Sequence, residues 1–473
     1  STGEDSSIPD TPGGDDTVKG VAKYVFSGGT VTVSASKEAI VGSVYGRSSV
    51  SLAENASVDG DIISNGDVTL GYHVSVKGLI CSDGSVSIAE SNDINGSINA
   101  KNNVTIKNAT ESGSITAGGN VVLEGSSQKV QGDINAGGNV TIACAANVTG
   151  NIIAGGTVTV NSAGSVISKN IHAGNNIVLN SRITVVGGVY SGQDMTFADS
   201  GASIGLDINA GRKALFTGWD GRYAKNVYAG TGVSMTGKTT VDGNVESGGD
   251  ISPISGWGSC IKGTAKAKGV IENCTGSSCG DGNCYIGARY QNQPSVVVPI
   301  SPEKPAGYKA CTVEDIPNPP YNSKTTNGAL SVKRGEIKTF TGGNYYYSTC
   351  NVEGGSTLQF DLSGKDINIF CTGNALMGNP TTIMISADGS KYKSMTSVDQ
   401  DLAAKVYLES NANIVLDWKA DWFGTLFARG SITFDGGNTF IGSYASQSGA
   451  AAVMRGSGYS MTYVLSNYAK ANW

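Results

Sequence analysis

An apolar residue recurs along this chain at intervals of 17 to 19 residues between Val44 and Val245. In nearly every unit a second apolar residue stands four positions earlier, as Val130 precedes Ile134, and a small residue such as Ala136 follows two positions later. A repeat this regular predicts a solenoid, because each unit can bury its apolar side chains only against the units above and below it. We expect seven of these positions to form one core ladder: Ile62, Ile80, Ile98, Ile115, Ile134, Ile152 and Ile171.

Within each unit the spacing is that of short β-strands. In residues 132–142, Ile134 and Ala136 are two positions apart, as are Val140 and Ile142, and alternate residues of a strand share a face. The earlier apolar column marks a third strand, and Gly and Asn fill the corners between strands. Each unit of about 18 residues therefore predicts one triangular rung. We expect an all-β chain that forms a right-handed β-helix (β-solenoid), because the strict six-residue repeat of the left-handed form is absent.

The repeat and the composition divide the chain into four predicted parts. Residues 1–20 are acidic and rich in Gly and Pro, and are expected to form an extended tail. Residues 21–251 form the β-helix, and residues 252–329 form a disulfide-rich and then Pro-rich connector. Residues 330–473 are expected to form a second β-helical domain, whose last segment, from Met454, caps an open end.

Nine cysteines favour disulfides and an oxidising, extracellular setting. Cys81 follows the inward Ile80 and should face outward, either as a free surface thiol or bonded to something outside its own rung. A bond to Cys144 is excluded, since three to four rungs separate the two residues by roughly 15 Å. Four connector cysteines can pair in three ways, and two later ones can staple neighbouring rungs. The disulfide candidates are Cys260, Cys274, Cys279, Cys284, Cys350 and Cys371.

Composition narrows the class of protein further. The net charge of −6, with no basic run, argues against nucleic acid as a partner. No run of 18 apolar residues predicts a membrane span. No leader segment is recognisable, and Ser1 is expected to be a processed N-terminus.

No catalytic site is expected. Enzymes that cleave polysaccharides need paired or clustered carboxylates, and the outward acids of this chain fall on different rungs. Those acids are Asp61, Asp133, Asp207 and Glu246. His73 falls at a corner, and His172 follows an inward residue and should point to solvent. Neither histidine has a Ser or Cys partner in triad spacing.

No metal or cofactor site is expected either. Asp399 and Asp401 are two carboxylates in one turn, which is weak evidence for Ca²⁺. The cluster Cys274, Cys279 and Cys284 lacks both CxxC spacing and a nearby histidine, so disulfides are favoured over a metal. The motif CxxCH, which attaches haem, is absent from the sequence.

Aromatic residues concentrate in the C-terminal region and have two interpretations. Exposed Tyr and Trp side chains can stack on sugars, which would suit a glycan-binding surface. The favoured interpretation is that large side chains such as Trp422 and Phe427 fill a wider core. The candidate surface aromatics are Tyr345, Tyr346, Trp418 and Trp422.

The units typified by Gly-Asp-Ile-Asn-Ala-Gly-Gly-Asn-Val-Thr-Ile (132–142) resemble the bactofilin-type polymer-forming β-helix over roughly residues 40–250. This resemblance implies a non-enzymatic protein that polymerises end to end.

The C-terminal region resembles a different group. The segments 342–347, 362–367, 421–428 and 441–444 are similar to the β-helical domain of PilX-like pilus-assembly and pilus-associated surface proteins, over about residues 330–445. Members of that group usually begin with a hydrophobic pilin-like helix, which this chain lacks. An anchoring helix on a separate polypeptide, or assembly through the β-helix and the tail, would replace it.

These observations predict a structural subunit of, or a protein associated with, an extracellular or pilus-like filament on a bacterial surface. Assembly would use an extended segment that adds a strand to an open rung of a neighbour, with residues 21–33 as the candidate donor. The alternative for that segment is that it forms the first rung of its own chain, since Phe26 stands 18 residues before Val44. Two other functions stay open: a surface adhesin for a glycan or host protein and, less favoured, a polysaccharide-degrading enzyme.

Overall fold

The computed structural model describes residues 24–33, 39–108, 113–198, 200–223, 225–253, 258–280, 282–311, 317–447, 452–454, 460–462 and 464–473. Over these residues the chain forms a β-solenoid of about 21 turns spaced about 19 residues apart, which confirms the predicted fold class. At the usual strand spacing the rod is about 100 Å long. A search of the described helices for one that is long and apolar enough to span a membrane finds none.

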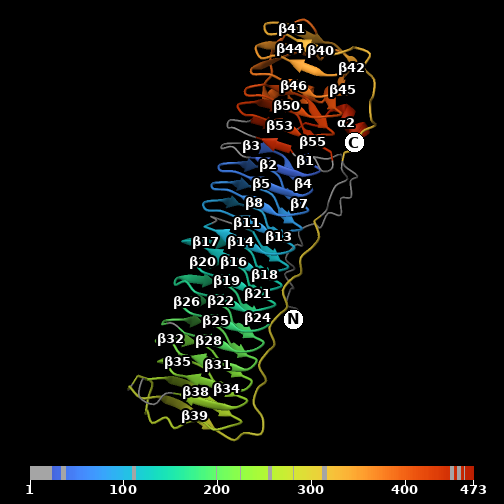
Figure 1. Cartoon of the computed structure of the whole chain (residues 1–473). Helices are drawn as coiled ribbons and strands as arrows, with labels where there is room; N and C mark the ends of the chain where they lie inside the picture. The colour runs from blue at the N-terminus through green and yellow to red at the C-terminus, as the bar shows by residue number, and fades with distance from the viewer. Residues whose placement is uncertain are drawn as a thin grey trace, which may run out of the picture.

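Three columns of parallel strands make the three sides of the rod (Figure 1). In one rung these are β18 (Ile134–Ala136), β19 (Val140–Ile142) and β20 (Ala145–Val148). Equivalent residues stack in register, so that Ile134 pairs with Ile152 and Val140 with Val158. The seven isoleucines of the core ladder are all buried, with at most 1% of each exposed.

The corners are fixed by small residues and by side chains that bond to the next rung. A Cβ added at Gly137 would lie 2.2 Å from the Gly118 carbonyl oxygen, so only glycine fits this close approach. Asp133 accepts a hydrogen bond from the Asn151 N–H at 2.6 Å, and Asn151 accepts one from the Asn170 N–H at 3.1 Å. Such ladders satisfy corner N–H groups that lie outside the strand pairings.

The regular rungs continue beyond the predicted end at Ile251. Strand β38 (Cys260–Ala267) pairs with both β35 (Thr239–Val241) and β36 (Val245–Ser247), and β39 (Tyr285–Tyr290) pairs with β38. The prediction of a connector from residue 252 was therefore wrong for its first part. The Cys-rich stretch hides two more rungs because its strands lack the Gly-Gly-Asn corner signal.

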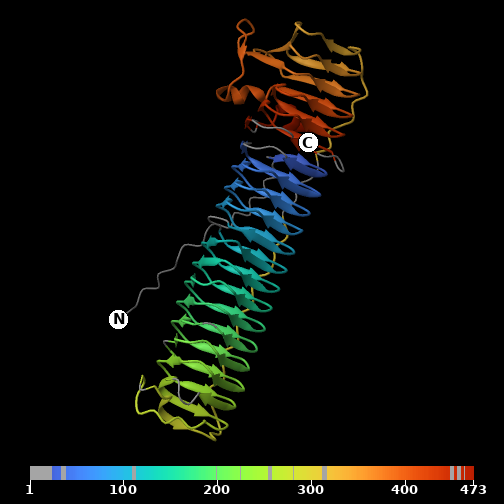
Figure 2. The same cartoon turned by 60° about the vertical axis from the view of Figure 1, so that its left-hand side comes forward.

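The two β-helical regions form one continuous solenoid, in an order opposite to that of the sequence. Strand β1 (Tyr24–Ser27) lies between β4 (Ser43–Gly46) and β55 (Tyr444–Ser446). In the same way β2 (Thr30–Val33) pairs with β56 (Ala452–Met454), and β3 (Ala39–Val41) pairs with β57 (Ser460–Thr462). Residues 330–462 therefore lie on top of the N-terminal rungs (Figures 1 and 2). We call this contact the junction.

The junction decides between the two expectations for residues 21–33 and corrects two others. The described part of that segment is the first rung of its own chain, with Val25, not Phe26, in register with Val44. The segment after Met454 does not cap a free end of the solenoid. It supplies β57 at the junction, and helix α2 (Asn467–Asn472) then packs beside β49 (Val406–Ser410). The proposed tail, residues 1–20, lies outside the described residues.

The free ends are both closed by their own side chains. At the C-terminal region's end, Phe340 is fully buried and Tyr345 packs edge-to-face on it, with ring centroids 5.0 Å apart. At the other end Ile271 and Ile286 are buried, and the loop between them carries two disulfides. End rungs that cover their apolar core in this way resist end-to-end association.

Candidate functional site: the strapped face and its latch

One side of the rod is covered lengthwise by an extended segment. Residues 294–311, which we call the strap, leave the last rung at β39 and run back along the rod (Figure 1). They cover the outward middle residues of one strand column, which we call the strapped face. From the last rung upward its members are Glu246, Tyr228, Asn209, Tyr190, His172, Ile153, Asn135, Thr116, Asn99 and Cys81.

The strap bonds to every second rung through every third residue. The backbone N–H groups of Val297, Ile300, Glu303, Ala306 and Lys309 donate to Glu246, Asn209, His172, Asn135 and Asn99, at 2.8, 2.9, 3.1, 2.9 and 3.4 Å. Three residues in polyproline II geometry advance about 9.3 Å, and two rungs advance about 9.6 Å. The two periods match, so every donor meets an acceptor.

The prolines of the strap stand where no donor is needed. Pro299, Pro302 and Pro305 each come directly before a residue whose N–H bonds to the face. Proline has no N–H and favours the extended conformation, so it preorganises the strap without removing a bond. The strap is therefore a built ligand for this face.

A disulfide closes the upper end of the strap. Cys81 and Cys311 are bonded, with Cα atoms 5.7 Å apart, although 230 residues separate them in sequence. This settles the alternatives for Cys81: it faces outward and bonds outside its own rung. Tyr308 beside it donates to Asp83 and accepts the Cys311 N–H at 3.1 Å. Burial, together with the bond to Asp83, raises the pKa of the Tyr308 hydroxyl to about 12.

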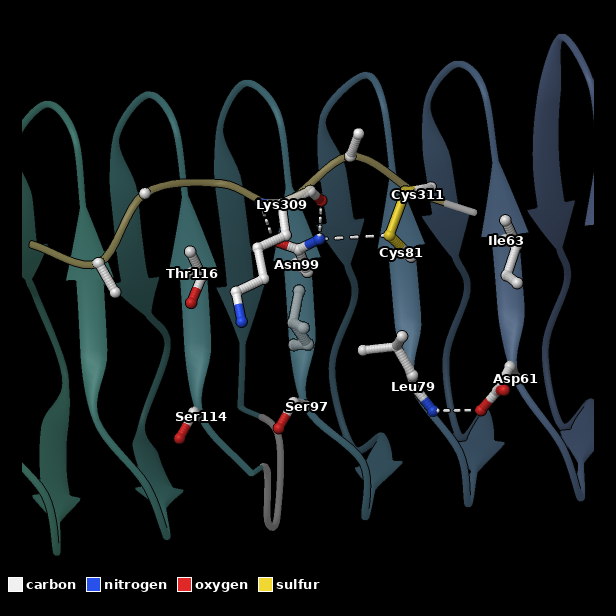
Figure 3. Close-up of a pocket in the computed structure, with 14 residues that line it drawn as sticks. Asp61, Ile63, Leu79, Cys81, Ser97, Asn99, Ser114, Thr116, Lys309 and Cys311 are labelled. Carbon is white, nitrogen blue, oxygen red and sulfur yellow. Dashed lines mark hydrogen bonds between the residues drawn. A yellow bond between two sulfur atoms is a disulfide. The ribbon is translucent and has the colours of Figure 1, made fainter. Parts of the chain in front are cut away.

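A groove of about 590 Å³ runs between the strap and the corner of rungs β7 (Ile62–Ser64) to β15 (Ile115–Ala117) (Figure 3). The disulfide closes one part of it, and Lys309 extends over the face. Asp61 is held by the Leu79 N–H at 2.7 Å. The groove is thus lined by one committed carboxylate, one lysine and small side chains, a set without a nucleophile and base for catalysis.

His172 lies beneath the strap rather than in solvent, which corrects the expectation for it. Its ring does point away from the core, but only 4% of the residue is exposed, and it stacks on Tyr190 at 4.6 Å. Its Nδ1 accepts the Glu303 N–H, so the neutral ring carries its proton on Nε2. Burial lowers the pKa of His172, and the nearby Glu303 carboxylate opposes part of that shift.

Beyond the latch the chain docks on the C-terminal region. Arg429 donates to the Pro319 carbonyl at 2.6 Å, and Asn411 donates to the Asn322 carbonyl at 2.7 Å. Arg429 also lies 3.6 Å from Glu409, which is 1% exposed. Burial raises the pKa of Glu409. The chain from residue 294 to 322 is thus anchored on both sides of the junction.

The other predicted cysteines pair as neighbours in the fold. Of the three possible pairings of the connector cysteines, the structure has Cys260–Cys279 and Cys274–Cys284. Cys350–Cys371 joins adjacent rungs. Cys144 is the free thiol of the described cysteines, and burial raises its pKa to about 11, which disfavours a reactive thiolate.

The four aromatic candidates do not form one surface. Trp422 is fully buried and packs edge-to-face on Phe360 at 5.8 Å, so the prediction of a surface role for it was wrong. Tyr345 lies on the inward side of its strand over Phe340. Tyr346 faces outward but stacks on Phe370 at 5.2 Å, and Trp418 is 40% exposed at a corner. Hydrophobic side chains this large were needed inside, because the C-terminal rungs are wider.

The scattered acids bond to neighbouring backbone. Asp133 and Asp207 each accept an N–H from the next rung, and Glu246 accepts one from the strap. Asp399 is paired with Lys393 at 2.6 Å. In the part of the chain that the structure describes, no group of three or more His, Cys, Asp or Glu side chains could hold a metal ion.

Comparison with known proteins gives a fold-level likeness only. No protein-family model matches the chain, and no curated protein matches it. A solved structure entitled "The structure of a possible adhesin C-terminal domain from Caldicellulosiruptor kronotskyensis" is 10% identical, with 94% of this chain and 92% of that chain covered and a TM-score of 0.21. A likeness at this TM-score carries no argument about residues or function.

Proposed function

We propose that the protein is a non-enzymatic, extracellular rod that carries axial load as a subunit of, or a protein associated with, a filament on a bacterial surface. The observation that carries this proposal is the strap. From residue 297 to residue 309 it spans eight rungs, about 38 Å, with 12 residues that reach about 37 Å in polyproline II geometry. The strap has almost no slack.

A taut strap changes how the rod responds to a pull along its axis. Rungs of a solenoid touch only their neighbours and would separate one by one. Here the chain at β39 and the Cys81–Cys311 bond close a covalent loop around the rungs between them. Separating those rungs would first require the strap to lengthen, and an extended chain reaches at most about 3.6 Å per residue.

Other features support the same role. Four disulfides are compatible with an extracellular protein. The resemblance of residues 40–250 to bactofilin-type helices and of residues 330–445 to the PilX-like domain supports a structural protein of a surface filament. Since both solenoid ends cover their own cores, assembly would not rest on simple stacking of ends, which revises the mode of assembly expected from sequence.

Electron microscopy of unreduced protein sheared from the producing cells tests the role. We expect rods about 100 Å long built into filaments with a regular subunit repeat. Immunogold labelling confined to the cell interior, or sheared fractions that hold isolated rods alone, would contradict the filament role.

Adhesion is the second function proposed, and Trp418 is the residue that supports it, as the exposed member of the four aromatic candidates. A glycan array with the whole protein and with Trp418→Ala tests it. Binding that disappears in the variant would favour the adhesin. Absence of binding by the unmodified rod would leave the load-bearing role alone.

A further inference from the structure

We propose that the junction is an interaction surface for a second copy of this chain, and that the Cys81–Cys311 bond is what keeps it closed within one copy. The proposal rests on the structural role above, and it names the partner and the surface. In the closed form, residues 330–473 of a chain cover its own first rung. In the exchanged form they would cover the first rung of another copy, with identical contacts.

The junction consists of elements that any copy supplies equally. Its three strand pairs, β1 with β55, β2 with β56 and β3 with β57, join segments more than 400 residues apart in sequence. No covalent link crosses these pairs. Ser27 and Ser446 face each other there, with hydroxyl oxygens 3.0 Å apart. Exchange of an identical element between copies costs no contacts, so the balance depends on how the element is tethered.

An apolar cluster on the outer side of the strapped column extends over the junction. Tyr45 and Ile63 contribute from the N-terminal rungs, and Phe427 and Ala445 from the C-terminal rungs, each at most 8% exposed. Cys81 and Cys311 belong to the same cluster. The latch thus sits within the contact that it stabilises.

The tether across the junction is short while the latch is closed. Cys311 is fixed on the rung of β10 (Ile80–Ser82), and Pro319 is fixed by Arg429 on the rung of β52 (Thr425–Ala428). Those rungs are five steps apart, about 24 Å. The eight residue steps from 311 to 319 reach at most about 29 Å, so the two anchors can separate by no more than about one further rung.

Opening the latch lengthens this tether several-fold. The next fixed point on the N-terminal side that does not belong to the strap is Gln293, whose N–H donates to the Ala267 carbonyl. The tether to Leu330 is then 37 residues. Effective concentration falls as roughly the −3/2 power of tether length, so the closed form loses about tenfold of its advantage.

The order of synthesis gives the latch its purpose. Strand β1 is made early and its partner β55 late, so the first rung waits with an open edge that is a template for pairing. Cys81 and Cys311 are both made before residue 330. A bond formed then would hold the C-terminal region beside its own first rung before another copy could supply one.

A crosslink across the junction tests the proposal. Ser27→Cys with Ser446→Cys places two thiols on adjacent, in-register rungs, at a separation that a disulfide spans. The pair is placed in the unmodified chain and in a Cys81→Ser/Cys311→Ser chain, and both are refolded at about 10 µM, where a short tether of millimolar effective concentration favours the closed form about a hundredfold. Non-reducing gels then read out which copy supplied each thiol.

We expect a monomer with an internal bond when the latch is present. Without the latch we expect about a tenfold larger share of crosslinked dimers and longer chains, rising with protein concentration. The control is Cys350→Ser/Cys371→Ser, which removes a bond inside the C-terminal region and should leave the monomer unchanged. Monomers alone at every concentration, in the chain without the latch, would overturn the proposal.

A second variant covers the case in which the chain without the latch does not fold. A flexible insertion of about 12 residues between Cys311 and Pro317 keeps every disulfide but lengthens the tether. It should also raise the share of interchain crosslinks, and a purely internal bond would again overturn the proposal. Filaments absent from cells would count against the proposed function alone, since this test uses purified protein.

Discussion

The two halves of the solenoid close their rungs with different side chains. In the N-terminal half, strands of three residues such as β18 stack Ile on Ile and Ala on Ala. In the C-terminal half, strands of five or six residues, such as β44 (Ser356–Asp361) and β45 (Ile367–Cys371), enclose Phe360 and Trp422. Uniform rungs spread stability evenly along the rod, whereas the wider rungs concentrate it in a few large residues.

The difference also explains where a periodic strap can lie. Proline-rich chain meets every second rung only where rungs are evenly spaced along an uninterrupted outward column, as from Glu246 to Asn99. In the C-terminal half the rungs carry insertions, among them residues 387–405 between β47 (Thr381–Ser386) and β49. There the chain is held by single anchors such as Arg429 instead.

Removing an aromatic residue from the wide core should have the largest effect. Trp422→Ala should lower the free energy of unfolding by about 3–5 kcal/mol, because a wide rung cannot collapse around the cavity. Trp418→Ala, at 40% exposure, is the control and should change it by less than about 0.5 kcal/mol. Denaturation in urea measures both. Equal effects would mean that the two tryptophans share one environment.

The regular half should respond weakly and evenly. Ile98→Val, Ile134→Val and Ile171→Val should each cost about 0.5–1.5 kcal/mol, since each removes one methyl group from an equivalent, fully buried site. Their values should agree within about 0.5 kcal/mol in the same denaturation assay. A single position that costs several times more than the others would contradict the uniform ladder.

Sequence predicted the regular half because its information is local. The alternation of Ile134 and Ala136 and the recurrence of that pair identify both the strands and their stacking. The junction was beyond such reasoning, because both halves share one period and the period does not say which rung lies on which. For the same reason the first rung was misregistered by one residue at Phe26, where the corner before Val44 is longer.

The strap did leave a signal that was missed. Pro299, Pro302 and Pro305 recur every three residues, and the outward positions Asn99, Asn135, His172, Asn209 and Glu246 recur every 36 or 37. Comparing the two periods as lengths would have suggested a match. The burial of Trp422 could not be decided from sequence, because a stacking platform and a wide core use the same residues.

Single strap contacts should matter locally. Asn135→Ala removes the acceptor of the Ala306 N–H, and we expect a loss of about 1 kcal/mol, seen as roughly fivefold faster hydrogen exchange in strap peptides that contain Ala306. Thr116→Ala, on the intervening rung that makes no strap bond in the described contacts, is the matched control. Equal exchange in both variants would show that the two-rung period carries no energy.

The smallest effect should be a pH dependence carried by His172. Burial lowers its pKa in the folded chain, so the unfolded chain binds a proton first as pH falls. The stability that comes from the neutral ring is therefore complete above about pH 6.5 and declines as pH falls from there towards the lower folded pKa. Glu303 faces the ring from the strap and weakens the shift, and Tyr190 stays neutral throughout.

Comparison of the two histidines isolates this term. Between pH 7.5 and 5.5, the unmodified protein should lose more of its melting temperature than His172→Gln does. His73→Gln, at an exposed corner, should follow the unmodified protein. If His172→Gln and the unmodified protein decline in parallel, the strap does not sense the proton, and its hold on the regular half comes from the matched periods and the disulfide alone.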